Sequence, residues 1–215
     1  MDVPRLRRSI LIISVLVAAF ARTLPAHANE TLAQISSVPS QAITGFLKGS
    51  WELQMSTGYT YTYRRTDANV TKLKGIPVIL GGGVVATDPI GASWYRGQIT
   101  VGGEVQFNQY VEPLSTYLVA LTPTAKYTFL ASDKLRPYVE IGAGIVWTDL
   151  ADRIPEKGSQ FNFNLQAGTG LSYFVLPTTS INVTYRFQHI SNAGTAQPNK
   201  GIDAGVVLIG ISKFF

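Results

Sequence analysis

Apolar and polar residues alternate with period two along most of the chain after residue 50. In the clearest segment, 51–64, the odd positions are mostly apolar or aromatic, from Trp51 to Tyr63, and the even positions are polar, from Glu52 to Arg64. Successive side chains of a β-strand point to opposite faces, so this pattern predicts strands with one apolar and one polar face. Eight segments are predicted as strands: 51–64, 72–86, 96–108, 116–130, 136–148, 159–174, 179–190 and 202–215.

The polar face of these segments favours a closed barrel in a membrane over a soluble sandwich, whose apolar face would turn inward. The polar face carries five charged residues that suit a narrow lumen with paired charges: Glu52, Glu104, Lys126, Glu140 and Arg186. On the opposite face, aromatic residues lie near the segment ends, as in interfacial girdles. An even number of strands closes the sheet, so no unpaired edge faces lipid. The predicted fold class is all-β, an eight-stranded antiparallel transmembrane β-barrel.

The lengths of the connections predict which end of the barrel faces outward. Compact turns are expected at 87–89, 132–134 and 177–179, and the other connections read as longer and more charged. In outer-membrane barrels, short turns face the periplasm and long loops face outward. The final strand, which ends at Phe215, resembles the aromatic-terminated last strand of such barrels.

The N-terminus has the layout of a secretory signal peptide. Three arginines among residues 5–8 precede the apolar run 9–20, and Ala26-His27-Ala28 forms a small-x-small cleavage site. The alternative, a membrane anchor, is disfavoured because Arg22 and Pro25 interrupt a run that is already shorter than the about 20 residues a spanning helix needs. We therefore expect a signal peptide at 1–28, a segment of uncertain structure at 29–50 and the barrel at 51–215.

Composition excludes several classes of function. Removing residues 1–28 takes away four of the 18 Lys and Arg and one of the 13 Asp and Glu, which leaves 14 against 12. No basic cluster alternates with aromatics, so no nucleic-acid partner is expected. Cysteine is absent and one histidine remains after the predicted cleavage, so no transition-metal site is expected. Three acidic residues between strands five and six suit either a divalent cation or a solvated acidic loop: Asp149, Asp152 and Glu156.

Gly81-Gly82-Gly83 lacks the helix and the Lys-Ser/Thr pair that follow a phosphate-binding loop. In a barrel wall it is more typical of a bend or bulge.

The candidate chemistry lies where strand seven ends. His189 and Ser191 are two residues apart, so on an extended chain they share a face, with Cα atoms about 6 to 7 Å apart. The antiparallel neighbour begins at Ile202-Asp203 and brings Asp203 near the imidazole. Such a trio can act as nucleophile, base and orienting carboxylate in serine hydrolysis. Asn192 and the amide of Gly194 are candidate donors to an oxyanion.

The parity of this trio places it on the lipid-facing wall. His189, Ser191 and Asp203 share the odd parity of the apolar residues of their strands. Ionisable groups at that face are costly and usually functional. The alternative is that this rim lies at headgroup depth, where such residues cost little.

The run 189–194, followed by Gln197-Pro198-Asn199 and Gly201-Ile202-Asp203, resembles the active-site segment of the PagL-like lipid A 3-O-deacylases. The resemblance implies an eight-stranded outer-membrane barrel with Ser191 as nucleophile, His189 as general base and Asp203 as orienting acid. Asn192 and Gly194 would lie near the oxyanion and Asn199 in the supporting loop. The best-known family members have Glu where this chain has Asp203. Shorter segments at 87–91, 137–140 and 161–163 resemble longer relatives labelled acyloxyacyl hydrolases.

This resemblance implies a cofactor-free serine esterase of the bacterial outer membrane that removes the 3-O-linked acyl chain of lipid A, with its active site towards the outer leaflet. Lipopolysaccharide is then the partner and substrate, and homodimerisation is left open. The alternative function is a non-enzymatic structural or adhesive barrel that carries the motif without using it. A pore is disfavoured because the interior of eight strands is only wide enough for side chains.

Overall fold

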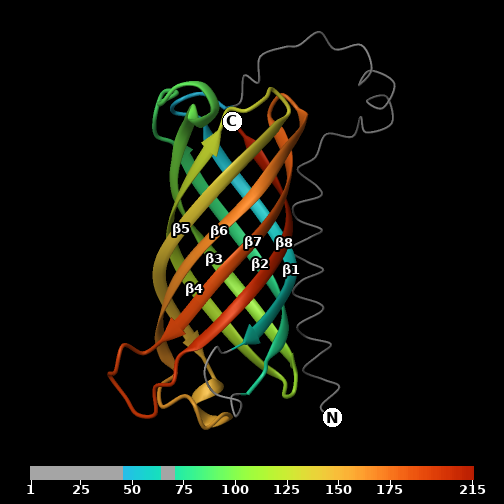
Figure 1. The fold of residues 1–215 in the computed structure, drawn as a ribbon. Coiled ribbons are helices and arrows are strands. Elements are labelled where there is room, and N and C mark those ends of the chain that lie inside the picture. Colours follow the sequence, from blue (N-terminus) through green and yellow to red (C-terminus); the bar gives the residue numbers. More distant parts are fainter. Residues whose placement is uncertain (1–45, 64–70) are drawn as a thin grey trace. The chain divides into compact units, whose positions relative to one another are not determined.

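Eight antiparallel strands form one closed barrel in the computed structural model, which describes residues 46–63 and 71–215 (Figure 1). Consecutive strands are neighbours, and β8 pairs with β1 to close the sheet. The predicted fold class is therefore confirmed. The strands are β1 Trp51–Tyr63, β2 Lys74–Val85, β3 Gly97–Glu112, β4 Thr116–Phe129, β5 Leu135–Thr148, β6 Phe161–Leu176, β7 Thr179–Ser191 and β8 Ile202–Phe214.

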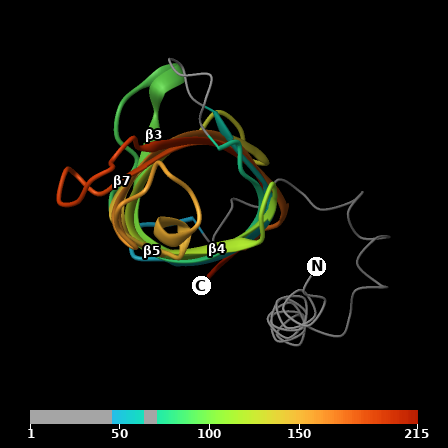
Figure 2. The same cartoon turned by 90° about the horizontal axis from the view of Figure 1, so that it is seen from below.

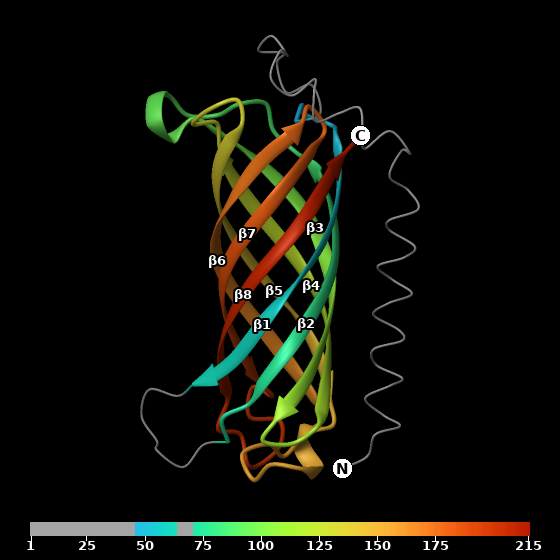
Figure 3. The same cartoon turned by 90° about the vertical axis from the view of Figure 1, so that its right-hand side faces the viewer.

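The connections gather at two opposite ends of the barrel. Connections 149–160 and 192–201 lie at the end that we call the site end, and the C-terminus lies at the other, the C-terminal end (Figure 1). Connection 86–96, which contains the 3₁₀ turn η1 Ser93–Tyr95, projects sideways at the C-terminal end (Figure 3). Trp94 in this turn is largely exposed.

Two connections contradict the predicted lengths. The β2–β3 connection spans 86–96 rather than a compact turn at 87–89, and the β3–β4 connection at the site end is only 113–115. In the first, Ile90 forms an isolated bridge with Gly97, the first residue of β3. The second is short because β3 continues to Glu112. Connection length alone therefore does not orient this barrel.

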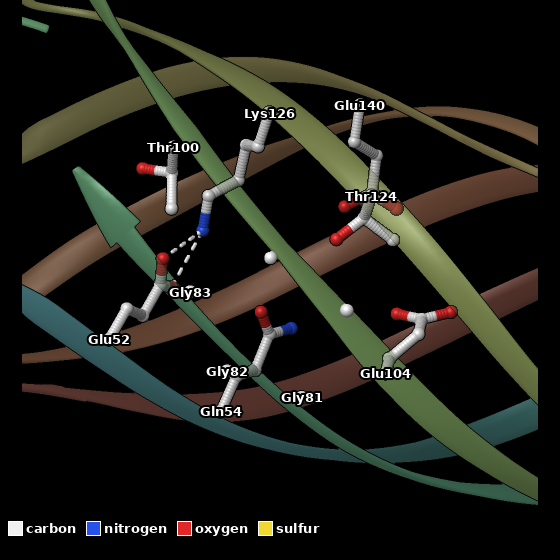
Figure 4. A pocket seen from close by; sticks show the side chains of 12 residues that line it. Glu52, Gln54, Gly81, Gly82, Gly83, Thr100, Glu104, Thr124, Lys126 and Glu140 are labelled. Atoms are coloured by element: carbon white, nitrogen blue, oxygen red, sulfur yellow. Dashed lines mark hydrogen bonds and ion pairs between the residues drawn. The ribbon is translucent and has the colours of Figure 1, made fainter. Parts of the chain in front are cut away.

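The alternation arises because successive residues of each strand face the lipid and the lumen in turn. Even residues face the lumen on β7, whereas odd residues face it on β2. On β7, Ile181 and Val183 are exposed while Asn182 and Thr184 are buried. The lumen pairs its charges as predicted: Lys126 Nζ lies 2.6 Å from Glu52 Oε1 (Figure 4). Arg186 contacts Glu104 at 2.6 Å and Glu140 at 2.8 Å. Buried charges require such partners, since an isolated one is very costly.

Apolar clusters close the polar lumen at both ends. At the site end, inward residues of five strands are apolar and pack with Leu150: Tyr110, Leu118, Val146, Ile190 and Ile202. Leu150 belongs to the 3₁₀ turn η2 Leu150–Asp152, which lies across the mouth of the barrel (Figure 2). At the C-terminal end, Phe46 packs against Phe174 and Phe214. The inward polar pattern therefore holds only between these two caps.

Gly81–Gly83 does not form the expected bulge. These glycines pair in continuous register with residues 102–104 of β3, and the irregularity of β2 lies between Lys74 and Gly75. The glycines instead allow β2 and β3 to approach closely: a Cβ on Gly102 would lie only 2.0 Å from the carbonyl oxygen of Gly82. The inner side of this patch adjoins a lumenal space near Lys126 and Glu140 (Figure 4).

The predicted signal peptide, 1–28, and residues 29–45 of the segment after it lie outside the described residues. The end of that segment, 46–50, is described: Phe46 is buried in the cap and the Gly49 amide donates to the Val85 carbonyl at 2.8 Å. Within the described ranges, no helix has the length and apolar character required to cross a membrane.

Candidate active site

His189 and Asp203 form a hydrogen-bonded pair on the outer face of the barrel. The β7–β8 register places them directly opposite each other. Nδ1 of His189 lies 2.6 Å from Oδ1 of Asp203, and their side chains are 37% and 25% exposed. The strand alternation produces this arrangement, since Gln188, Ile190 and Ile202 beside them are buried in the lumen. Because Nδ1 is engaged by the carboxylate, Nε2 is the nitrogen that can accept a proton from another group.

Ser191 is the last residue of β7 and lies on the same face as His189. It pairs with Phe163 of β6 and is half-buried. Its hydroxyl forms no hydrogen bond with any described residue, so the strand brings Ser191 and His189 to the same face without joining them. Nucleophile-to-base contacts are often longer in ligand-free sites and tighten when substrate binds.

The 192–201 connection folds around the side chain of Asn192, which is fully buried. Its Nδ2 donates to the Ala196 carbonyl at 2.8 Å, and its Oδ1 accepts from the Gly194 amide at 2.9 Å. The backbone amide of Asn192 donates to Oδ1 of Asn199 at 3.2 Å. Asn199 thus contacts the start of the connection. An amide NH₂ has two hydrogens, so Asn192 retains one donor, whereas the Gly194 amide is already engaged.

Two backbone features of this connection are not visible in the sequence. Ala193 adopts a left-handed conformation with φ of 53°, and its amide forms no hydrogen bond within the described part of the chain. Gly201 has φ of 62°, and a Cβ there would lie 3.0 Å from Cε1 of His189. The glycine therefore lets the backbone lie against the imidazole and helps to fix its position.

An apolar groove runs along the lipid-facing wall next to this group. It has a volume of about 650 Å³ and crosses strands β4 to β7. Leu165, which pairs with His189, lies at one side, and Phe187, two residues before His189, lies at another. The small side chains of Ala125, Ala143 and Ala167 leave the space open.

The acidic residues considered for a cation are used otherwise. Asp149 forms an ion pair with Arg153 at 2.8 Å and accepts a hydrogen bond from Thr116. Glu156 accepts the Thr71 amide at 2.7 Å. Across 46–63 and 71–215, no three His, Cys, Asp or Glu residues are grouped as a metal site requires.

A closed barrel with an apolar outer wall, a polar lumen and a His-Asp pair beside a serine on that wall defines the class: an outer-membrane β-barrel with a candidate hydrolytic site. Residues 115–212 match the family model of lipid A 3-O-deacylase (PagL). This range begins just before β4, ends within β8 and includes His189, Ser191 and Asp203.

A lipid A deacylase PagL from Pseudomonas aeruginosa is 32% identical over 96 residues, which cover 43% of this chain and 51% of the relative. The chain thus spans about half the length of that curated relative. The crystal structure of the outer membrane enzyme PagL matches with a TM-score of 0.51 and 23% identity, covering 74% of this chain and 97% of that one. Neisserial surface protein A matches with a TM-score of 0.59 and 18% identity, covering 78% and 100%.

These findings confirm the resemblance to the PagL family, which residues 115–212 carry, and the outer-membrane location of the barrel. The same fold occurs in an enzyme and in a surface protein, so the fold alone assigns no activity. The activity must be argued from the site.

Proposed function

We propose that the chain is a serine esterase that hydrolyses the 3-O-linked acyl chain of lipid A. The observation that carries this proposal is the 2.6 Å contact of His189 with Asp203 on the lipid-facing wall, within the range that matches the family. Ionisable residues on that wall reduce stability, and those that are present usually serve a function. A lipid substrate reaches such a site directly from the bilayer.

In this proposal Ser191 is the nucleophile, His189 the general base and Asp203 the orienting carboxylate. Ser191 Oγ attacks the ester carbonyl carbon while its proton moves to Nε2 of His189. The tetrahedral intermediate collapses, the bond between the carbonyl carbon and the sugar O-3 breaks, and O-3 takes the proton from His189. Water then attacks the acyl-serine, with His189 as base, and releases a 3-hydroxy fatty acid.

The donor that we assign to the oxyanion is the amide of the exposed Ala193, whereas the fully buried side chain of Asn192 holds the shape of the connection. Preorganised donors of this kind stabilise charge that develops in the transition state. The Gly194 amide, expected from the sequence to be a donor, instead orients Asn192 through its Oδ1. Asn199 holds the start of the connection through the amide of Asn192.

The apolar groove supports an acyl chain as the bound group. It adjoins the site through Leu165 and Phe187 and has no charged residue in its lining. We assign the site end to the outer face of the membrane, where lipid A forms the outer leaflet. No cofactor takes part in these steps.

Mass spectrometry of lipid A from cells that express the chain tests the proposal. We expect the loss of one 3-hydroxyacyl group with the wild-type chain, and an unchanged profile with Ser191→Ala or His189→Ala, both of which retain the heat-modifiable migration of a folded barrel. An unchanged profile with a correctly inserted wild-type chain contradicts the proposal.

The second candidate is a non-enzymatic barrel, which the similarity to Neisserial surface protein A leaves available. A fluorophosphonate probe separates the two functions. Covalent labelling of Ser191 in the detergent-solubilised chain, abolished by His189→Ala, supports the esterase. Labelling of Ser191 that does not depend on His189, or no labelling, supports the non-enzymatic barrel.

A further inference from the structure

Residues 156–158 of the β5–β6 connection contact two other parts of the site end, the segment before β2 and the 192–201 connection. Glu156 accepts the amide of Thr71, just before β2. The Gly158 amide donates to the Pro198 carbonyl at 2.8 Å, and the Lys200 amide donates to the Glu156 carbonyl at 3.2 Å. A backbone bridge links Lys157 to Asn199. These residues therefore hold the 192–201 connection against the barrel.

Lys157 is buried in this junction, and within residues 46–63 and 71–215 it has no counter-ion. Only 2% of the residue is exposed. Its Nζ donates to Oδ1 of Asn162 and to the carbonyl of Ile190, both at 3.0 Å. No carboxylate in the described ranges forms an ion pair with it, and the adjacent Ile190 belongs to the apolar cap. A buried ammonium with only neutral partners costs stability, and burial accordingly lowers the pKa of Lys157 to about 8.

Stability alone does not account for a lysine at this position. An apolar side chain of similar length would pack on the cap without the desolvation cost, and replacing buried charges by apolar residues is often neutral or stabilising. Residues that reduce stability are typical of sites that require a fixed geometry. The hydrogen bonds of Lys157 indicate which geometry that is.

Lys157 fixes the chain on both sides of Ser191. The Ile190 carbonyl that it binds belongs to the peptide bond that leads into Ser191. Its backbone pairs with Asn199, whose side chain accepts the amide of Asn192, the residue after Ser191. One residue thus anchors the peptide before the serine and, through Asn199, the peptide after it.

We propose that Lys157 is a positioning residue, which sets Ser191 at the distance and angle from His189 that proton transfer requires. This role of Lys157 rests on the proposed esterase function and adds a positioning residue to it. Lys157 acts through the Ile190 carbonyl and Asn199 and touches neither the acyl chain nor the reacting atoms. Errors of about 1 Å in such positioning can lower rates by as much as 10²-fold.

Lys157→Met tests this role, because it keeps the length and packing of the side chain and removes the amine. The matched control is Lys200→Met, which makes the same change at an exposed lysine of the adjoining connection. The first readout is the rate at which a fluorophosphonate labels Ser191, which requires no lipid A. The second is the separation of kcat from KM with lipid A as substrate.

We expect Lys157→Met to insert and resist heat at least as well as the wild type, yet to label about tenfold more slowly or worse. Its kcat falls while its KM stays within about twofold, since the acyl groove is untouched. Lys200→Met behaves as the wild type. Labelling of Lys157→Met at the wild-type rate overturns the proposal, and so does failure of this variant to fold, which would make Lys157 a structural residue.

Gly158→Ala provides an independent variant. A Cβ at this position would lie 2.3 Å from the Gln197 carbonyl oxygen, so it forces the two connections apart while leaving Lys157 in place. We expect slower labelling here too, and an unchanged rate in the folded variant contradicts the proposal. A wild-type chain that labels Ser191 but spares lipid A refutes the substrate assignment alone. One that does not label refutes the esterase and, with it, this inference.

Discussion

Asp203 contacts His189 with its carboxylate oxygen 2.6 Å from Nδ1, although the best-known members of the resembled family have the longer Glu at this position. The contact is made because the β7–β8 register places the two residues directly opposite each other. Facing residues of an antiparallel pair have Cβ atoms about 4.5–5.5 Å apart, a separation that a short carboxylate can span.

This register predicts how substitutions at Asp203 behave. Asp203→Asn keeps the size of the side chain and removes the charge that fixes the tautomer of His189, so kcat should fall on the order of 10⁴-fold. Asp203→Glu should keep most of the activity, because the carboxylate remains within reach. The measurement is ester hydrolysis by purified folded barrels. Equal loss in both variants would show that Asp203 does not act through its charge.

Gly201 should be required for the position of His189. A Cβ there would lie 3.0 Å from Cε1 of the imidazole, so Gly201→Ala displaces the ring. The substitution also introduces backbone strain, because φ is 62°. Gly49→Ala is the matched control: its φ is 88°, but no atom lies within 4 Å of its Cβ, and it is far from the site.

Both glycine variants should lose a similar amount of stability, roughly 1–2 kcal/mol. Only Gly201→Ala should show a lower kcat/KM. Equal activity in the two folded variants would mean that the close approach of Gly201 to His189 has no catalytic consequence.

Arg186 should be the most stability-determining residue of the lumen. Arg186→Met leaves the carboxylates of Glu104 and Glu140 buried without a counter-ion, a type of change that costs about 3–5 kcal/mol. Adding Glu104→Gln and Glu140→Gln removes the unpaired charges and should restore most of the loss. Unfolding in denaturant, followed by heat-modifiable migration, measures the difference. A single variant as stable as the triple one would contradict the pairing.

Lys157 should make stability rise at alkaline pH. Burial lowers its pKa from the ordinary 10.5 to about 8, so between these values the unfolded chain binds more protons than the folded one. The free energy of unfolding therefore increases as pH rises through this window. The titratable groups nearby are Glu156 in the same connection, Lys200 in the 192–201 connection and the His189–Asp203 pair on the outer face of β7 and β8.

Lys157→Met keeps these neighbours and lacks the amine, so their titration cancels in a comparison. Stability of both chains is measured by denaturant at pH 7 and pH 10. We expect the wild type to gain relative to the variant at pH 10. A difference in unfolding free energy between the two chains that is the same at pH 7 and pH 10 would contradict the burial of the amine.

The sequence predicts the barrel because lipid and a polar lumen impose opposite requirements on successive residues. The prediction of strand bounds fails where successive residues no longer alternate between apolar and polar. Tyr110 faces inward but is apolar, since it belongs to the cap at the site end, and the predicted third strand therefore stops at 108 although β3 continues to Glu112. The lengths of the connections 86–96 and 113–115 also differ from those expected, because the alternation does not mark where the adjoining strands end.

The candidate site was predictable as far as strand geometry defines it. Parity and antiparallel pairing bring His189, Ser191 and Asp203 to one face. The contact of Gly201 with His189, the left-handed conformation of Ala193 and the burial of Lys157 depend on how the connections fold, for which no periodic pattern exists. The charge of Lys157 would by itself have predicted an exposed side chain.

Ser191 is proposed to hydrolyse the 3-O-linked acyl chain of lipid A. The most direct measurement incubates the purified, folded chain with lipid A in detergent and quantifies free 3-hydroxy fatty acid together with the lipid that lacks it, for the wild type and for Ser191→Ala. We expect one equivalent of fatty acid per lipid A with the wild type and none with the variant. Equal amounts from both chains, or none from a wild type whose Ser191 labels with a fluorophosphonate, would contradict this proposal.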